Sequence, residues 1–155
     1  MDGTGRDETD EERLDRKFDD LLQELRVMQT GAQLTAGFLL TLPFQQKFSD
    51  LDDFQVALYL ALVLLAALTT ALVMGPVAVH RHLSGRHVKG RVVDSAHRIV
   101  YGVITCIALL ISGMVLLVWD VVAGRAWAVL AAGAIAVVLL ALLVVLPRRL
   151  DDRAA

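Results

Sequence analysis

The stretch FQVALYLALVLLAALTTALVMGPVAV, residues 54–79, decides the fold of this chain. It contains no Asp, Glu, Lys or Arg, and an uncharged apolar run of about 18 residues or more is the signature of a helix that crosses a membrane. The hydrocarbon offers no water to the peptide groups, so a spanning segment must satisfy its own backbone hydrogen bonds, as a helix does. The sequence therefore predicts a transmembrane helix over these residues.

Three further runs of the same kind fill most of the remaining chain. With 56% hydrophobic residues among 155, there is room for one bundle with short connections and no separate soluble domain. The fold class that we expect is all-α: a polytopic membrane protein whose transmembrane domain covers residues 27–147. Its four predicted helices, packed as a bundle, span about 27–44, 54–79, 99–119 and 126–146.

The basic residues predict the orientation of this bundle. Lys47 and Arg125 are the only cations in the first and third connections, so the other 13 of the 15 Lys and Arg residues lie in the N-terminal segment, the middle connection and the C-terminus. The positive-inside rule then places both termini in the cytoplasm, in a bacterial inner (plasma) membrane. Aromatic rings, which favour the membrane–water interface, flank the two connections assigned to the outside: Phe44, Phe48, Phe54, Trp119 and Trp127.

The segment before the first span predicts a cytoplasmic amphipathic helix over residues 9–26. Thr9 and Glu12 match a capping box, which satisfies the first free N–H groups of a helix. This segment is rich in acid, which argues against binding to an anionic membrane surface, so we expect the helix to run on into the first span and to pack against the basic middle connection. Residues 1–8 are expected to be a disordered tail, and residues 148–155 a cytoplasmic tail. The predicted apolar stripe, at helical spacing, consists of Leu14, Phe18, Leu21, Leu22 and Leu25.

The first span is more polar than the other three. One face of it, reached in steps of three and four residues, carries Arg26, Gln29, Gln33, Gly37 and Thr41. A side-chain amide that faces lipid without a partner costs several kcal/mol, so this face must look into the bundle or toward a partner chain. Two interpretations stay open: hydrogen bonds that hold helices together, or a polar lining for an ion, a lipid headgroup or a small solute.

The middle connection is basic and holds all four histidines. Imidazole clusters can bind metals, but the spacing of His80, His82, His87 and His97 matches no established ligand pattern, and the interleaved cations would repel a metal dication. Contact with anionic lipid headgroups explains the same segment more simply. We therefore expect no metal, no cofactor and no nucleic acid. The expected headgroup contacts are Arg81, Arg86, Lys89, Arg91 and Arg98.

Catalysis is not expected, because no Ser/His/Asp arrangement, paired internal carboxylates or phosphate-binding glycine loop occurs. Proton-coupled transport usually needs an ionisable residue within the membrane, and the nearest carboxylates, Glu24, Asp94 and Asp120, fall at the ends of the predicted spans. Cys106 is the single cysteine, so no disulfide can form within one chain.

Two stretches resemble a known family: Glu24-Leu25-Arg26-Val27 with Gln29-Thr30-Gly31, and Leu39-Leu40-Thr41-Leu42-Pro43-Phe44. The similarity continues through Leu51-Asp52-Asp53-Phe54-Gln55 to His80-Arg81. The chain resembles uncharacterised four-span membrane proteins of actinobacteria, a domain-of-unknown-function family with some members labelled sodium:proton antiporter. The resemblance implies the fold and the membrane location.

These observations lead us to expect a binding or accessory membrane protein, assembled as a homo-oligomer or with another membrane protein. The alternative is a cation/proton transporter or channel subunit that uses the polar face of the first span.

Overall fold

The structure is a computed structural model that describes residues 10–83 and 89–149 of the chain. Within these two stretches it contains helices and no strands. The elements follow one another as α1 (Asp10–Thr41), the 3-10 turns η1 (Leu42–Phe44) and η2 (Gln46–Asp50), α2 (Asp53–Leu83), α3 (Lys89–Ala123), α4 (Arg125–Leu140) and the π-helical segment η3 (Ala141–Val145), after which the helix continues to Arg149.

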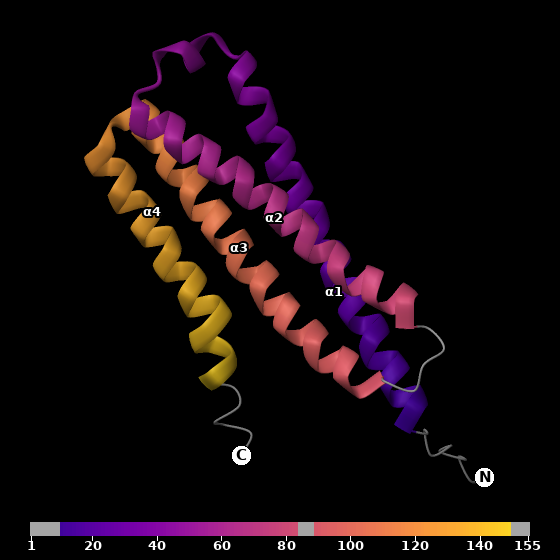
Figure 1. The fold of residues 1–155 in the computed structure, drawn as a ribbon. Coiled ribbons are helices and arrows are strands. Elements are labelled where there is room, and N and C mark those ends of the chain that lie inside the picture. The colour runs from indigo at the N-terminus through magenta and orange to yellow at the C-terminus, as the bar shows by residue number, and fades with distance from the viewer. Residues whose placement is uncertain (1–9, 84–88, 150–155) are drawn as a thin grey trace, which may run out of the picture.

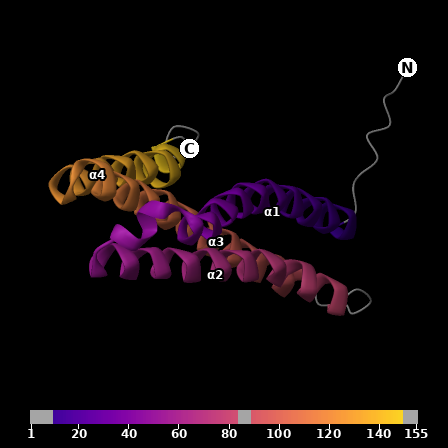
Figure 2. The ribbon, with the colours of Figure 1, turned by 90° about the horizontal axis from the view of Figure 1, so that it is seen from above.

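Successive long helices run in opposite directions (Figure 1). Seen from above, α2 lies along one side, α1 and α4 lie on the other, and α3 lies between them (Figure 2). Among the described elements, α3 contacts all three other long helices, whereas α4 packs against α3 alone. One end of the bundle, called the turn end below, carries η1, η2 and the α3–α4 turn. The opposite end carries the first residues of α1 and α3 (Figure 1).

The core consists of two apolar clusters that join α1, α2 and α3. Near the middle of α1, Leu25 packs with Val73 of α2 and Val103 of α3. Nearer the turn end, Leu39 packs with Tyr59 and other residues of α2 and α3. Residues 25–39 of α1 therefore run beside residues 59–73 of α2, in the opposite direction.

One close helix contact explains a glycine of the third predicted span. A Cβ atom added to Gly113 would lie 2.5 Å from Cδ2 of Leu62, a buried residue of α2. Glycine at this position thus lets α2 and α3 approach closely.

Three helical segments of the described chain are long and apolar enough to cross a membrane. They are Asp53–Gly75, Arg98–Ala123 and Arg125–Arg149, with mean hydropathies of 2.5, 2.5 and 3.2. They correspond to the second, third and fourth predicted spans. The first predicted span is not among them, because its amide and hydroxyl side chains lower its hydropathy. That α1 also crosses the membrane remains a prediction.

The boundaries of several elements differ from the predicted ones. The predicted amphipathic helix and the predicted first span form one continuous helix, α1, as we expect from the sequence. Helix α2 continues through Pro76 to Leu83, and α3 begins at Lys89, so most of the predicted middle connection is helical. The fourth span is predicted to end at Leu146, but the helix continues through Pro147 to Arg149. Proline lacks the N–H that a regular helix would use at this position, and the π-helical η3 ends two residues before it, at Val145.

Candidate functional site

The polar face predicted for the first span lies on the outside of α1. The side of α1 that packs in the bundle is lined by Leu25, Ala32 and Leu39, which are 2%, 3% and 1% exposed. Gln33 points away from this side and is exposed, and Gln29 is half-buried. The sequence left open whether this face looks into the bundle or toward a partner chain. The exposed residues of the face point outward, away from α2 and α3. Its exposed members are Arg26, Gln33, Gly37 and Thr41.

The hydroxyl groups near this face are satisfied within α1, and the amides are not. Thr30 Oγ1 donates to the carbonyl of Arg26 at 3.1 Å, and Thr41 Oγ1 donates to the carbonyl of Phe38 at 2.7 Å. In the described part of the chain, the side chains of Gln29 and Gln33 form no hydrogen bond. The outer face of α1 therefore presents amide groups that need partners.

The depth of these amides follows from the packing of α1 on α2. Leu25 and Leu39 lie beside Val73 and Tyr59, and both of these α2 residues belong to the apolar segment Asp53–Gly75. Gln29 and Gln33 fall between the two levels. Where that α2 segment crosses the hydrocarbon, the two amides are at hydrocarbon depth as well.

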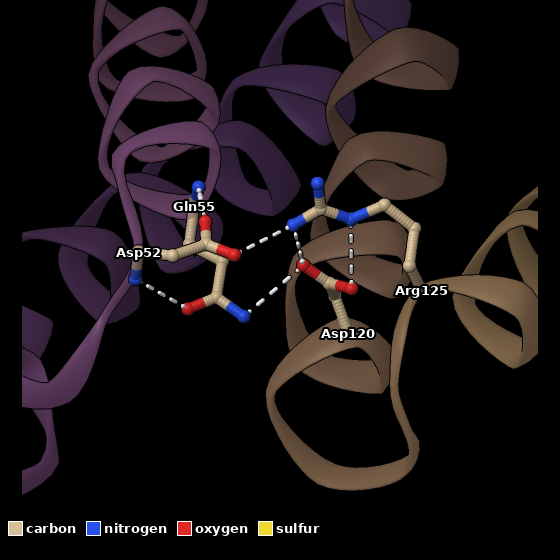
Figure 3. A network of polar contacts seen from close by, with 4 residues as sticks. All are labelled: Asp52, Gln55, Asp120 and Arg125. Carbon is tan, nitrogen blue, oxygen red and sulfur yellow. Dashed lines mark hydrogen bonds and ion pairs between the residues drawn. The ribbon is translucent and has the colours of Figure 1, made fainter.

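A second polar site lies at the turn end and begins with the cap of α2. The backbone N–H of Gln55 donates to Asp52 Oδ1 at 2.8 Å, and the backbone N–H of Asp52 donates to Gln55 Oε1 at 3.0 Å. This reciprocal pair is a capping box, which satisfies N–H groups that a helix start leaves free. It also fixes both side chains beside the α3–α4 turn (Figure 3).

An ion pair from that turn completes the network. Arg125 Nε donates to Asp120 Oδ1 at 3.2 Å, and Arg125 Nη2 donates to Asp120 Oδ2 at 2.9 Å and to Asp52 Oδ2 at 2.8 Å. Gln55 Nε2 donates to Asp120 Oδ2 at 3.1 Å. The guanidinium carbon of Arg125 lies 3.9 Å from the centroid of the Phe54 ring, a cation–π contact. Figure 3 shows one terminal nitrogen of this guanidinium in contact with the carboxylates of both Asp52 and Asp120.

Burial decides what this network does. The Asp120 side chain is 3% exposed, whereas the Arg125 side chain is 47% exposed. A buried carboxylate is tolerated when it is paired and hydrogen-bonded, and here both oxygens accept hydrogen bonds. No buried side-chain nitrogen or oxygen of the described residues lacks a partner. The network therefore uses its own polar groups to tie the start of α2 to the α3–α4 turn.

This network was not predicted from the sequence, although Asp120 is a carboxylate at the end of a predicted span. Two signals were present. Asp52 and Gln55 have the spacing of a capping box, and Arg125 is the single cation of its connection. Nothing in the linear sequence shows that these two signals meet.

Of the five basic residues predicted to contact lipid headgroups, Arg98 is the one whose side chain the structure describes. Arg98 is exposed near the start of the apolar part of α3. Arg86 lies outside the described residues, and the side chains of Arg81, Lys89, Arg91 and the four histidines are outside the description as well. The expected docking of the acidic segment on this connection therefore stays a prediction.

Comparison with known proteins shows the family to which the chain belongs. A family model described as "Family of unknown function (DUF6328)" matches residues 7–147, which include both polar sites. No curated protein matches the chain, and no solved structure does.

Proposed function

We propose that this chain, which belongs to the DUF6328 family of unknown function, is a binding or accessory membrane protein that assembles with a second copy through the outer face of α1. The observation that carries this proposal is the exposed, unpaired amide of Gln33, which lies at the level of the apolar segment of α2 and points away from it.

The proposal includes α1 as a fourth membrane crossing. Helix α1 has 32 residues. At ~1.5 Å per residue its length is about 48 Å, which exceeds the ~30 Å of a hydrocarbon core. Its residues 25–39 lie against the apolar part of α2, so a bilayer that surrounds α2 also surrounds this part of α1. Helix α1 ends at Thr41, and the turns η1 and η2 connect it to the start of α2. Two helices that cross the membrane as a hairpin need such a short connection.

The energetic reason for assembly is the cost of an unpaired amide in lipid. Transfer of an amide from water to an apolar medium without a hydrogen bond costs about 2–7 kcal/mol. Two copies that meet along this face can pair Gln33 with Gln33, since each amide offers both donors and an acceptor. A single interhelical hydrogen bond in a membrane contributes only ~0.6 kcal/mol on average, so apolar packing must add to it. Val27, Leu34 and Phe38, exposed by 75%, 79% and 48%, supply apolar surface for that packing.

Transport is the second candidate function, and it rests on the same face. In an oligomer larger than a dimer, Arg26, Gln29 and Gln33 from several copies would line a polar pathway. Such an assembly would be a cation/proton transporter or a channel subunit.

Cysteine crosslinking tests the assembly. In a Cys106→Ser background, Gly37→Cys should form a dimer with a short thiol crosslinker in native membranes, because Gly37 lies one turn from Gln33 on the same exposed face and the substitution keeps the Gln33 amide. Val137→Cys is the matched control, because Val137 is 66% exposed on α4 near the middle of the span Arg125–Arg149. A monomeric Gly37→Cys protein, or equal crosslinking at both positions, would contradict assembly through α1.

Flux measurements separate the two candidate functions. Proteoliposomes with the unmodified protein are given sodium, potassium and pH gradients in turn. The accessory function predicts no flux above empty liposomes. Flux that is lost in Gln33→Leu, while the protein still dimerises and keeps its helical content, would favour transport.

A further inference from the structure

Helices α3 and α4 diverge away from the turn between them (Figure 1). Next to the turn they are in close contact, and Ala128 is 0% exposed. Toward the opposite end they leave an open groove with a volume of about 560 Å³. This volume lies in the range of about 300–1,000 Å³ that is typical of small-molecule sites.

The groove covers one half of the membrane depth. On α3 it extends from Ser112 to Tyr101, and on α4 and its continuation from Ala136 to Arg148. Ser112 and Ala136 lie near the middle of the spans Arg98–Ala123 and Arg125–Arg149. A stretch of 12 or 13 helical residues is about 18–20 Å long at ~1.5 Å per residue. One leaflet of a bilayer with a ~30 Å core contributes about 15 Å of hydrocarbon, so the groove extends from the midplane to the headgroups of one leaflet.

The walls of the groove accept hydrocarbon. Besides aliphatic side chains they contain two hydroxyl groups of Ser and Thr, both satisfied within α3. Thr105 Oγ1 donates to the carbonyl of Tyr101 at 2.8 Å, and Ser112 Oγ donates to the carbonyl of Ala108 at 2.9 Å. An apolar occupant therefore leaves neither hydroxyl without a hydrogen bond.

The outer mouth of the groove is cationic. Arg148 and the ring of Tyr101 line it. Arg98 is exposed seven residues before Thr105 and so lies on the same side of α3. A guanidinium group and a phenol hydroxyl at this depth can donate hydrogen bonds to a phosphate, and Arg–phosphate contacts are among the strong charge-assisted ones. Among the described residues, no acidic side chain lines this groove.

A neighbouring groove of about 520 Å³, between α1, α3 and α4, has a different character. It is lined by Glu24 on α1, whose carboxylate would repel an anionic headgroup, and by no cation of the described chain. The combination of hydrocarbon walls with a cationic mouth distinguishes the α3–α4 groove.

We propose that the α3–α4 groove binds one acyl chain of an anionic phospholipid, with Arg148 and Tyr101 holding its phosphate. The cationic mouth favours a lipid over a second helix. A phosphate at the mouth can accept charge-assisted hydrogen bonds from Arg148, whereas an apolar helix brings no anion to this guanidinium. The site is separate from the outer face of α1, and it depends on the membrane location but not on assembly.

The π-helical segment η3 belongs to this site. Leu143 and Val144, both within η3, line the groove. A π-turn holds more residues than an α-turn, so it changes which face the following residues present, and such turns are frequent at functional sites. Here Pro147 and Arg148, which follow this turn, both line the groove.

Lipid retention tests the proposal. The protein is reconstituted in nanodiscs with equal amounts of phosphatidylglycerol and phosphatidylcholine, released into mild detergent, and analysed by native mass spectrometry. Phosphatidylglycerol should be retained at least fivefold over phosphatidylcholine. Arg148→Gln should remove this preference, whereas Arg149→Gln, a cation that does not line the groove, should change it less than twofold.

A second pair of variants tests the groove independently of charge. Ala136→Phe fills the groove and should abolish retention of both lipids. Ala134→Phe makes the same change on an exposed position of α4 outside the groove lining and should leave retention unchanged. Equal circular dichroism of the two variants controls for folding. Equal retention of both lipids by the unmodified protein, or unchanged retention in Ala136→Phe, would overturn the proposal, as would a protein–protein adduct in place of a lipid adduct from a photoreactive residue at Leu109.

Discussion

Asp120 and Arg125 form a two-pronged ion pair across the α3–α4 turn, with N–O distances of 3.2 and 2.9 Å. The two residues are five positions apart, and Gly124 between them has φ 87°, a value that residues other than glycine rarely adopt. The turn brings the arginine back over the carboxylate near the end of α3. Asp52 and Gln55 then attach this pair to the start of α2, so one arginine links three helices at the turn end.

Loss of Arg125 should leave the buried Asp120 carboxylate without its cation. We expect Arg125→Gln to lower the free energy of unfolding, by less than the loss of one partner costs in a fully buried pair, because the arginine is half-exposed. Asp120→Asn should cost less, since it leaves no buried charge. The double variant Asp120→Asn/Arg125→Gln should recover part of the loss seen in Arg125→Gln. Denaturation in detergent micelles measures these values, and equal stability of Arg125→Gln and the unmodified protein would contradict the role of the pair.

The cap of α2 predicts a smaller effect at Asp52. Asp52→Ala removes the acceptor of the Gln55 N–H and should cost about 1 kcal/mol, with about 0–1 kcal/mol more from the exposed ion pair to Arg125. Asp52→Asn keeps a capping oxygen and should lose only the ion-pair part. The same denaturation measurement at low and at high salt separates the two parts, because only the ion pair is screened. If Asp52→Asn were as unstable as Asp52→Ala, the cap would contribute nothing.

Two glycine substitutions should differ because their surroundings differ. At Gly113 an added methyl group meets Leu62, which is 3% exposed and enclosed by its neighbours. Gly113→Ala should therefore destabilise the bundle by about 1–3 kcal/mol through overpacking. At Gly37 nothing lies within 4 Å of the added atom. Gly37→Ala should be neutral or stabilise α1 by up to about 1 kcal/mol. A Gly113→Ala variant as stable as Gly37→Ala would show that α2 and α3 separate without cost.

Accessibility of single cysteines should establish the number of crossings. In a Cys106→Ser background, Ser49→Cys and Ala126→Cys should react with an impermeant reagent in intact cells, whereas Ser84→Cys should react only after permeabilisation, since the basic residues favour the cytoplasm on that side. Gly124 is unsuitable for this test because of its positive φ. An N-terminal tag decides the fourth crossing. With α1 across the membrane the tag is on the side of Ser84, and with three crossings it is on the side of Ser49.

The sequence by itself determined the all-helical class and the three most apolar segments. Pro43 accounts for the end of α1 at Thr41, three residues before the predicted end of the first span at Phe44. These properties are local. The mean hydropathy of about 20 consecutive residues decides whether a segment partitions into hydrocarbon, and a proline disfavours helical geometry in the residue before it. The common face of Arg26, Gln33 and Thr41 was equally predictable, because it depends only on the helical period.

The tertiary structure alone decided where these faces point and which distant residues meet. The polar face of a membrane helix can turn into its own bundle or toward a partner chain, so the contrast between Leu25 and Gln33 in the sequence of α1 does not show which of the two faces inward. Asp52 and Arg125 are 73 positions apart, and their contact depends on how α2 packs against α3. The α3–α4 groove likewise arises from the divergence of two helices, a property of their packing and not of either sequence alone.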